Sequence, residues 1–393
     1  MNIKQRVMAA VNRKKVDKIP TAYRGIDYLT KSIYKYFGFE NHNIKDYKKV
    51  LREMGADLWS DGQCPGAFSF FMPETTYPSP KDPFVKEGVY FYTLGIKARL
   101  KLIKKYNYNT IIWWDDPPLA GIDSYRDVKG FLTSKLDNYR FDRFINKSVV
   151  NAKSDFKNTG VELDCYDYEN FKDSDDDIIC MGSLNEPFII CSYLRGFEQF
   201  LMDLVTNKKL AEAIISEVEA FCEEFNQREL AGFGKNAEWY SMWDDVAGQD
   251  GLMFSPELFK KYFLPIYKKL IGNAKKYNQI FSWHCCGNVN DVLPLMIDAG
   301  IDVFDVVQTS AKDMSIEKIY KQYGKDVCLH GAVDVQKLLI SGKPKDIEDE
   351  IKKIIDLWGD EGGIIIAPSH EALPETPIEN ILTIYKTVNK EMN

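Results

Sequence analysis

The sequence lacks any apolar run long enough to cross a membrane, and it has no internal repeat and no low-complexity tract. A membrane-spanning helix needs about eighteen or more consecutive apolar residues, and no window of the 393 residues approaches this length. The N-terminal segment also lacks the long apolar core and the small-residue cleavage site of a signal peptide. We therefore expect a cytoplasmic protein that does not bind membranes.

Common nucleotide-binding and hydrolase motifs are absent as well. The chain contains neither a GxGxxG nor a GxxxxGK[ST] phosphate loop, and it contains no GxSxG nucleophile elbow. A net charge of −7 and a pI near 5.4 argue against nucleic acid as a partner. A hydrophobic content of 45% with 28% charged residues is typical of a globular protein with a sizeable core.

The eight cysteines show no spacing typical of a disulfide framework. Cys180, Cys191 and Cys328 lie in apolar runs, so we expect them to be buried thiols. Cys286 differs because a histidine, His284, precedes it by two positions.

The last 115 residues alternate apolar runs with amphipathic helical patterns, which indicates βαβ units and a parallel sheet. The runs lie at 278–283, 301–307, 326–330 and 363–367, and the helical patterns at about 290–299, 314–323, 344–358 and 377–390. The middle of the chain adds strands at 177–181 and 238–246 and helices near 196–206, 208–232 and 256–277. Polar or reactive residues follow several of the strands, as they do at the active-site face of a barrel. We therefore predict a (β/α)8 TIM-type barrel.

The N-terminal part is less regular. Helices are expected at 2–12 and near 43–54, and strands at 56–60 and 110–114. An aromatic, proline-bearing stretch from Cys64 to Tyr92 is interpreted as a lid or wall over the barrel mouth. The simplest organisation is one domain over residues 1–393, in which residues 1–110 form a helical and irregular N-terminal extension with lid segments.

The run from Ile280 to Gly287 predicts a buried strand that ends in a histidine and two cysteines. Side chains two apart on a strand point to the same side, so His284 and Cys286 project together and Cys285 faces away. An imidazole and a thiolate side by side form half of a tetrahedral zinc site.

His370 follows a different strand of the same predicted barrel face. Three ligands, His284, Cys286 and His370, would leave one tetrahedral position open, which matches catalytic zinc. The alternative is that His370 is an independent acid/base group and Cys286 only packs.

Asp244 and Asp245 follow another strand, and adjacent carboxylates there point to opposite faces, so at most one enters the pocket. We take Asp245 as a candidate catalytic residue, while helix capping or loop bracing is as good an account of either aspartate. A capping role is also expected for Asp334. Further candidates for binding a polar substrate lie near strand ends: Arg24, Asp61, Gln308 and His330.

These stretches resemble the uroporphyrinogen decarboxylase superfamily. The resemblance covers most of the chain and is carried by residues 244–259, 284–289, 300–308, 330–334 and 367–380. It implies a (β/α)8 barrel with its site at the C-terminal mouth. It also implies one of two chemistries: cofactor-free decarboxylation of a tetrapyrrole, or zinc-dependent methyl transfer between a corrinoid and a thiol.

The resemblance assigns roles to individual residues. The zinc methyltransferases of the superfamily use His-x-Cys and a distant cysteine, and His284 and Cys286 match the first two ligands. His370 stands where the third ligand is a cysteine, and the decarboxylases keep a functional histidine at the same place. The arginine-rich motif of the decarboxylases is reduced to Arg24, and the sequence at 59–61 echoes the motif that contains their pyrrole-binding aspartate, here Asp61.

Three functions follow as expectations. The first is a zinc-dependent methyltransferase that works with a corrinoid on a separate protein and with a small methyl donor or acceptor, since the chain has no AspxHisxxGly-type corrinoid motif. The second is a decarboxylase of a porphyrinogen-like substrate with Asp61, Arg24 and His370 in its pocket. The third is a non-catalytic barrel that binds a corrinoid or a tetrapyrrole. A homodimer is the candidate assembly.

Overall fold

The computed structural model describes most of the chain with several gaps. Described are residues 1–39, 44–59, 89–91, 97–103, 108–115, 117–138, 178, 180–182 and 185–392. Asp61 and most of the stretch interpreted as a lid, residues 64–88, lie outside these ranges.

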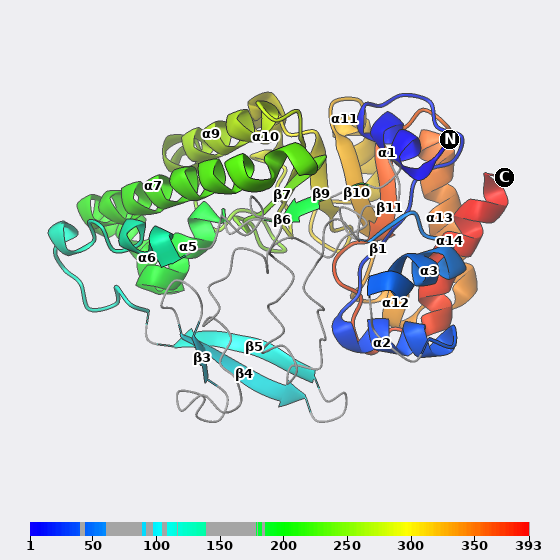
Figure 1. The fold of residues 1–393 in the computed structure, drawn as a ribbon, viewed down its shortest axis with the longest axis horizontal. Helices are drawn as coiled ribbons and strands as arrows, with labels where there is room; N and C mark the ends of the chain where they lie inside the picture. The colour runs from blue at the N-terminus through cyan, green and yellow to red at the C-terminus, as the bar shows by residue number, and fades with distance from the viewer. Residues whose placement is uncertain are drawn as a thin grey trace.

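A sheet of parallel strands forms the centre of the molecule (Figure 1). Six strands pair in chain order: β6 (Cys180–Gly182), β7 (Trp239–Trp243), β8 (Ile280–His284), β9 (Val303–Val307), β10 (Cys328–Val333) and β11 (Ile364–Pro368). Strands β1 (Ala22–Tyr23) and β2 (Leu58–Trp59) also pair in parallel, and a parallel bridge from Thr21 to Ile366 joins β1 to β11. The described residues thus contain eight parallel strands in the order β6 to β11, then β1 and β2.

The eight strands surround one interior. Each contributes a buried side chain to a single hydrophobic cluster: Ala22, Leu58, Cys180, Trp239, Ile280, Val303, Cys328 and Ile365. Helix α1 (Ile3–Val11) adds Val7 and Val11 to this cluster and so covers the N-terminal end of the barrel. The arrangement confirms the predicted (β/α)8 TIM-type barrel.

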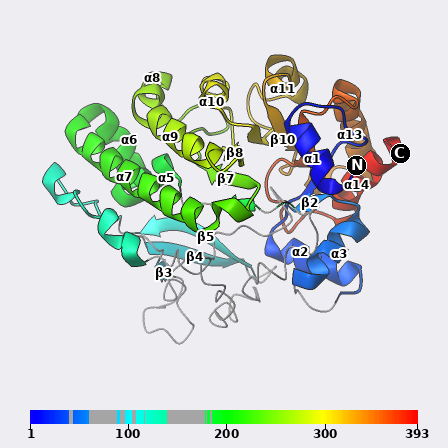
Figure 2. The same cartoon turned by 45° about the horizontal axis from the view of Figure 1, so that its top comes forward.

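Helices surround the strands (Figures 1 and 2). They are α5 (Pro187–Arg195), α6 (Phe197–Thr206), α7 (Lys208–Phe233), α10 (Leu293–Ala299), α11 (Ile316–Tyr323), α12 (Leu338–Ser341), α13 (Pro344–Trp358) and α14 (Ile378–Glu391). Helix α13 begins at Pro344, whose missing N–H is not needed there, and is followed by Gly359 with φ of 57°. In the described part of the chain, no helix combines the length and the apolar character needed to cross a bilayer.

The helix predicted over 256–277 is interrupted. Ser255 caps its start by accepting a hydrogen bond from the Leu258 N–H at 3.3 Å. A short α8 (Pro256–Leu258) leads into a π-helical turn, η9 (Phe259–Phe263), before α9 (Leu264–Lys275). Pro265 has no N–H for the carbonyl four residues earlier, so regular α-helical bonding cannot continue through this point.

The N-terminal segment contributes to the barrel wall as well as covering it. Strands β1 and β2 lie in the wall, and α2 (Asp27–Tyr36) and α3 (Ile44–Met54) follow β1 along the chain. A separate antiparallel sheet consists of β3 (Val89–Phe91), β4 (Lys97–Ile103) and β5 (Tyr108–Asp115), and β5 contains the strand expected at 110–114. Figure 1 shows this sheet on the same side of the barrel as α2 and α12, the side of the C-terminal strand ends.

Replacing Trp239 tests the packing of the lower barrel interior. The side chain is fully buried, and its Nε1–H donates to Ser282 Oγ at 2.7 Å. We expect Trp239→Ala to lower the free energy of unfolding by about 3–5 kcal/mol, measured by urea denaturation. Val205→Ala, at a position 65% exposed on α6, is the control and should change it by less than about 0.5 kcal/mol. Equal effects of the two substitutions would contradict the packing described here.

Candidate metal centre

Neighbouring strands place a row of polar and aromatic side chains at one level of the barrel interior. The strand register aligns Trp243 with His284, His284 with Asp305, and Asp305 with His330. Each lies two or four residues after a side chain of the interior cluster, so the two-residue period of a strand turns it inward too. Arg24 lies two residues after Ala22 of β1 and faces the same interior.

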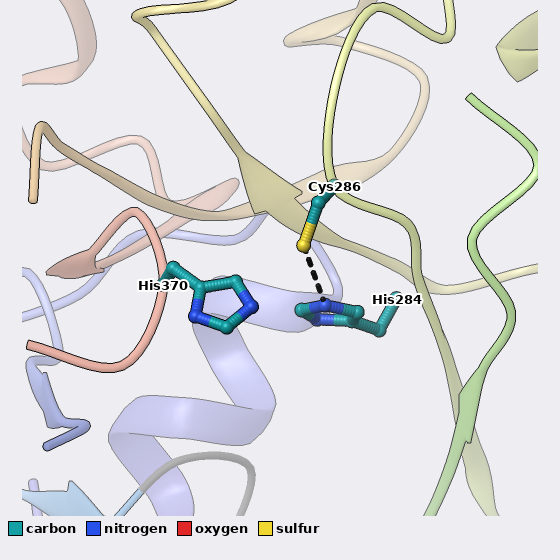
Figure 3. A group of neighbouring side chains, drawn as sticks. All are labelled: His284, Cys286 and His370. Atoms are coloured by element: carbon teal, nitrogen blue, oxygen red, sulfur yellow. Dashed lines mark hydrogen bonds between the residues drawn. The ribbon is translucent and has the colours of Figure 1, made fainter. Parts of the chain in front are cut away.

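Three side chains with metal-ligating atoms converge just beyond this row (Figure 3). One ligand atom each from His284, Cys286 and His370 lies within 4.8 Å of the other two. The Nε2 atom of His284 is 3.1 Å from Cys286 Sγ. His284 ends β8, Cys286 follows it, and His370 follows β11, so the site is built from the C-terminal ends of two strands that β9 and β10 separate.

Asp305 holds the other side of the His284 ring. His284 Nδ1 lies 2.5 Å from Asp305 Oδ2, and Arg24 Nη2 donates to the same oxygen at 2.9 Å. Burial alone would raise the pKa of Asp305, but the charges of Arg24 and His284 hold that pKa well below its usual value. Asp305 is therefore a carboxylate.

Charge and stacking act together on His284. Burial lowers the pKa of His284, but the Cys286 sulfur and the Asp305 carboxylate outweigh burial and raise that pKa well above its usual value. Trp243 stacks on the imidazole with ring centroids 4.2 Å apart and planes 16° apart. The Arg24 guanidinium lies 5.3 Å from the centre of the Trp243 ring. The ring of His284 therefore has little freedom to turn.

The Cys286 turn requires glycine at the next position. Gly287 has φ of +112°, and a Cβ there would lie 2.4 Å from the Gly248 carbonyl oxygen. The Cys286 N–H donates to Asp245 Oδ1 at 2.7 Å. Cys285 is fully buried in the hydrophobic core, and the sulfur of Cys286 is left near His284, as the two-residue spacing predicts.

The segment that carries His370 is fixed on both sides. The Ser369 N–H donates to the Val333 carbonyl at 2.7 Å, and Ser369 Oγ accepts from the Val335 N–H at 3.2 Å. On the other side, the Ala372 N–H donates to the Arg24 carbonyl at 3.1 Å. Burial, followed by the charges of His284 and Arg24, lowers the pKa of His370 to about 4. His370 is therefore neutral near pH 7 and has a lone pair to offer.

The two neighbouring aspartates have different environments. The Asp244 carboxylate is buried and accepts hydrogen bonds from the N–H groups of Phe188 and Ile189, both at 2.9 Å, and from the Tyr267 hydroxyl at 2.7 Å. Asp244 thus caps the start of α5, as one of the two interpretations of this pair predicts. Asp245 instead braces the loop of Cys286.

The structure places the other predicted site residues around the same row. Arg24 is 3% exposed and paired with Asp305, His330 is fully buried with Nδ1 3.1 Å from Asp305 Oδ1, and Gln308 is 4% exposed just after β9. Substrate binding by these three residues, and by Asp61 outside the described ranges, stays a prediction, as do the catalytic roles of Asp245 and His370.

The sequence interpretation missed Asp305 and two glutamates near the site. Burial raises the pKa of Glu186 well above its usual value, and the charges of Asp244 and Asp245 add to the effect. Burial also raises the pKa of Glu371, which follows His370. The charge of His284 opposes both shifts, and for Glu371 so does that of Arg24, which places both carboxyls near the site. The only sequence signal for Asp305 was its position, two residues after an apolar side chain that faces the interior.

The donor set fits a tetrahedral metal ion. Bond lengths of about 2.0–2.1 Å to nitrogen and 2.3 Å to sulfur put neighbouring ligand atoms of such a site about 3.3–3.6 Å apart. The 3.1 Å between His284 Nε2 and Cys286 Sγ is close to that range, and the third donor is within 4.8 Å. The Asp305 carboxylate on Nδ1 of His284 is the usual companion of a metal-binding histidine. Within the described part of the chain, His284, Cys286 and His370 form a group that could hold one metal ion.

Asp244 and Asp245 should differ in their effect on stability. Asp244→Ala leaves three buried donors without their acceptor, and we expect the free energy of unfolding to fall by about 3 kcal/mol or more. Asp245→Ala removes one hydrogen bond to a loop and should cost about 1 kcal/mol. Urea denaturation of the two variants measures the difference, and an equal loss would show that capping of α5 is not what distinguishes the two aspartates.

Comparison with known proteins places this chain in a family. The chain is 23% identical over 202 residues to the methylcobamide:CoM methyltransferase MtbA of Methanosarcina acetivorans. The match covers 51% of this chain and 55% of that protein. It is 28% identical over 207 residues to MtaA of Methanosarcina barkeri, another methylcobamide:CoM methyltransferase, covering 52% and 56%. The chain thus spans about half the length of the curated relatives it matches.

A solved methyltransferase from Methanosarcina mazei shares the fold over the full length of both chains, with a TM-score of 0.66 and 17% identity. The family model described as uroporphyrinogen decarboxylase (URO-D) matches residues 169–391, more than half of the chain, including all three converging side chains. The chain belongs to the uroporphyrinogen decarboxylase family.

Proposed function

We propose that this protein is a zinc-dependent methyltransferase that moves a methyl group between a corrinoid protein and a small thiol or methylated substrate. The observation that carries the proposal is the convergence of His284, Cys286 and His370 at the C-terminal end of the barrel strands. A decarboxylation that needs no cofactor has no use for an imidazole and a thiol held 3.1 Å apart.

The ligand types favour zinc among the common metal ions. Thiolate and imidazole suit zinc, whereas magnesium and calcium prefer oxygen. Three protein ligands leave one tetrahedral position for water or substrate, the pattern of catalytic rather than structural sites. The relatives named as methylcobamide:CoM methyltransferases support a reaction in which a corrinoid is one partner and a thiol the other.

In this proposal the residues have distinct tasks. His284, Cys286 and His370 hold the ion, which when bound would supply the positive charge that keeps a thiol deprotonated near neutral pH or polarises a methylated substrate. Cys286 contributes the one anionic ligand, and Asp245 fixes its backbone through the 2.7 Å hydrogen bond. His370, with its lowered pKa, is neutral and ready to bind without first losing a proton.

The methyl group is transferred without the electron pair of the bond that breaks. In the direction from corrinoid to thiol, the sulfur supplies the electron pair of the new carbon–sulfur bond. The pair of the broken cobalt–carbon bond stays with the corrinoid, and the thiol proton passes to solvent. In the reverse direction, the reduced corrinoid supplies the electron pair of the new cobalt–carbon bond. The demethylated substrate keeps the pair of the bond that breaks and takes up a proton.

Removing the thiolate should remove both metal and activity. We expect the purified wild-type protein to contain close to one zinc per chain and Cys286→Ser to bind zinc more than about tenfold more weakly, because loss of a direct ligand exceeds the effect of losing a supporting residue. Zinc content by elemental analysis and demethylation of methylcob(III)alamin with coenzyme M, followed by absorbance, are the two measurements.

Cys285→Ala is the matched control, since its sulfur is buried one position away and faces the core. It should keep the zinc content and the methyl transfer of the wild type. Wild-type protein without near-stoichiometric zinc, together with an unchanged metal content in Cys286→Ser, would rule the proposal out. Turnover of uroporphyrinogen would then establish a decarboxylase, and tight corrinoid binding without turnover a binding protein.

A substitution at His370 separates a ligand from an acid/base group. Cysteine can replace histidine as a zinc ligand but cannot replace a neutral imidazole as a proton carrier near pH 7. We expect His370→Cys to keep at least half of the bound zinc and His370→Ala to bind zinc about tenfold more weakly or worse, as measured by competition with a chelator. Equal zinc affinities of His370→Ala and wild type would show that His370 is not a ligand.

A further inference from the structure

Asp305 occupies the middle of the inward-facing row. It lies on β9, between the strand of His284 and the strand of His330, and the register aligns it with both histidines. Its side chain is completely buried, so water does not solvate the carboxylate. The protein must therefore supply every group that stabilises this charge.

Both carboxylate oxygens of Asp305 face nitrogen atoms. Oδ2 is 2.5 Å from His284 Nδ1 and 2.9 Å from Arg24 Nη2, and Oδ1 is 3.1 Å from His330 Nδ1. The three partners come from β8, from the residue after β1, and from β10. A single carboxylate thus links His284 to Arg24 and to His330, which is not one of the three converging side chains.

The contact with Asp305 decides which nitrogen of His284 is available. A carboxylate can only accept, so His284 Nδ1 must carry a proton and donate it. The Nε2 atom is then the nitrogen that faces Cys286 Sγ, and it is the nitrogen that can offer a lone pair to a metal ion once its own proton has left. Without the carboxylate, the ring could adopt the other tautomer or turn about χ2.

Arg24 stabilises the buried carboxylate of Asp305. Arg24 is 3% exposed, and its guanidinium donates to Oδ2 and lies over the Trp243 ring. A buried carboxylate without such a partner would take up a proton and lose its acceptor function. Arg24, predicted as a substrate-binding residue, thereby also has a supporting role beneath the site.

We propose that Asp305 is the positioning residue of the metal centre: it fixes the tautomer and orientation of His284, and Arg24 holds the Asp305 side chain in place through the 2.9 Å hydrogen bond. This inference rests on the proposed function, because it assumes that His284 binds a metal ion. It extends that function by assigning metal affinity to a residue that never touches the ion.

The test compares the same substitution in two buried Asp–Arg pairs. Asp305→Asn removes the charge but keeps the shape of the side chain, and we expect its affinity for zinc to fall by about 10–100-fold in competition with a chelator. The matched control is Asp203→Asn, because Asp203 is 2% exposed and pairs with Arg195 at 2.7 Å, far along the chain from the metal-ligating group. It should keep the wild-type affinity, whatever it loses in thermal stability.

Cobalt(II) provides a readout that a purely structural role would not change. In protein loaded with cobalt in place of zinc, we expect the visible absorption bands of Asp305→Asn to shift relative to wild type, because the imidazole donor has changed its orientation, while those of Asp203→Asn stay the same. If Asp305→Asn does not fold, the double variant Arg24→Gln with Asp305→Asn removes both charges and avoids an unpaired buried guanidinium.

The outcomes are distinguishable. Wild-type protein that binds no zinc contradicts the proposed function itself. Wild-type protein that binds zinc, with unchanged zinc affinity and cobalt spectrum in Asp305→Asn or in the double variant, contradicts only the role of Asp305. Equal losses of affinity in Asp305→Asn and Asp203→Asn would show a general loss of stability and would also overturn the proposal.

Discussion

The alternation of side chains along parallel barrel strands is the constraint on which the centre depends. Every second side chain faces the interior, and the interior has apolar and polar levels. The lower level contains large apolar side chains such as Trp239 and Ile280. His284 lies four residues after Ile280 and therefore faces the same interior at the next polar level, where its partners can only be other inward-facing residues. Closure of the barrel thus determines which residues can meet.

The charges at this polar level depend on one another. Asp305 is ionised because Arg24 and His284 lie beside it, and Arg24 is held because Asp305 accepts its hydrogen bond. The backbone of Arg24 also accepts a hydrogen bond from Ala372, next to the segment that carries His370. Arg24, the residue after β1, therefore connects the surroundings of His284 and His370, although it comes from the least regular part of the sequence.

Sequence reasoning reached several side chains at strand ends but missed Asp305 within β9. His284, Cys286 and His370 could be predicted because the C-terminal ends of parallel strands meet at one face, a consequence of topology alone. Asp305 could not, because it lies inside an apolar run, and its importance depends on the register that puts a histidine on each side.

Signals for helix starts could be predicted from the sequence, whereas roles that depend on tertiary contacts could not. Pro344 and Ser255 mark the helix starts they predict, since their effect acts on their own backbone. For Asp244 and Asp245, the alternation correctly separates the two side chains, but only the position of α5 shows which one caps a helix. The interruption near Pro265 was missed by the helix predicted over 256–277, although a proline without an N–H cannot continue regular α-helical bonding.

His370 stands where the resemblance to the zinc methyltransferases predicts a cysteine, and this difference changes the charge of the proposed centre. A divalent ion with one thiolate and two neutral imidazoles carries a net charge of +1, whereas two thiolates and one imidazole would bring it to zero. The paired charges of Asp305 and Arg24 cancel each other, so this pair does not change the difference between the two ligand sets. An incoming thiolate would neutralise the excess charge, and a neutral methylated substrate would be polarised by it. Both effects grow with the excess charge. In this proposal the histidine therefore strengthens the attraction between the metal ion and its fourth ligand in either direction of methyl transfer.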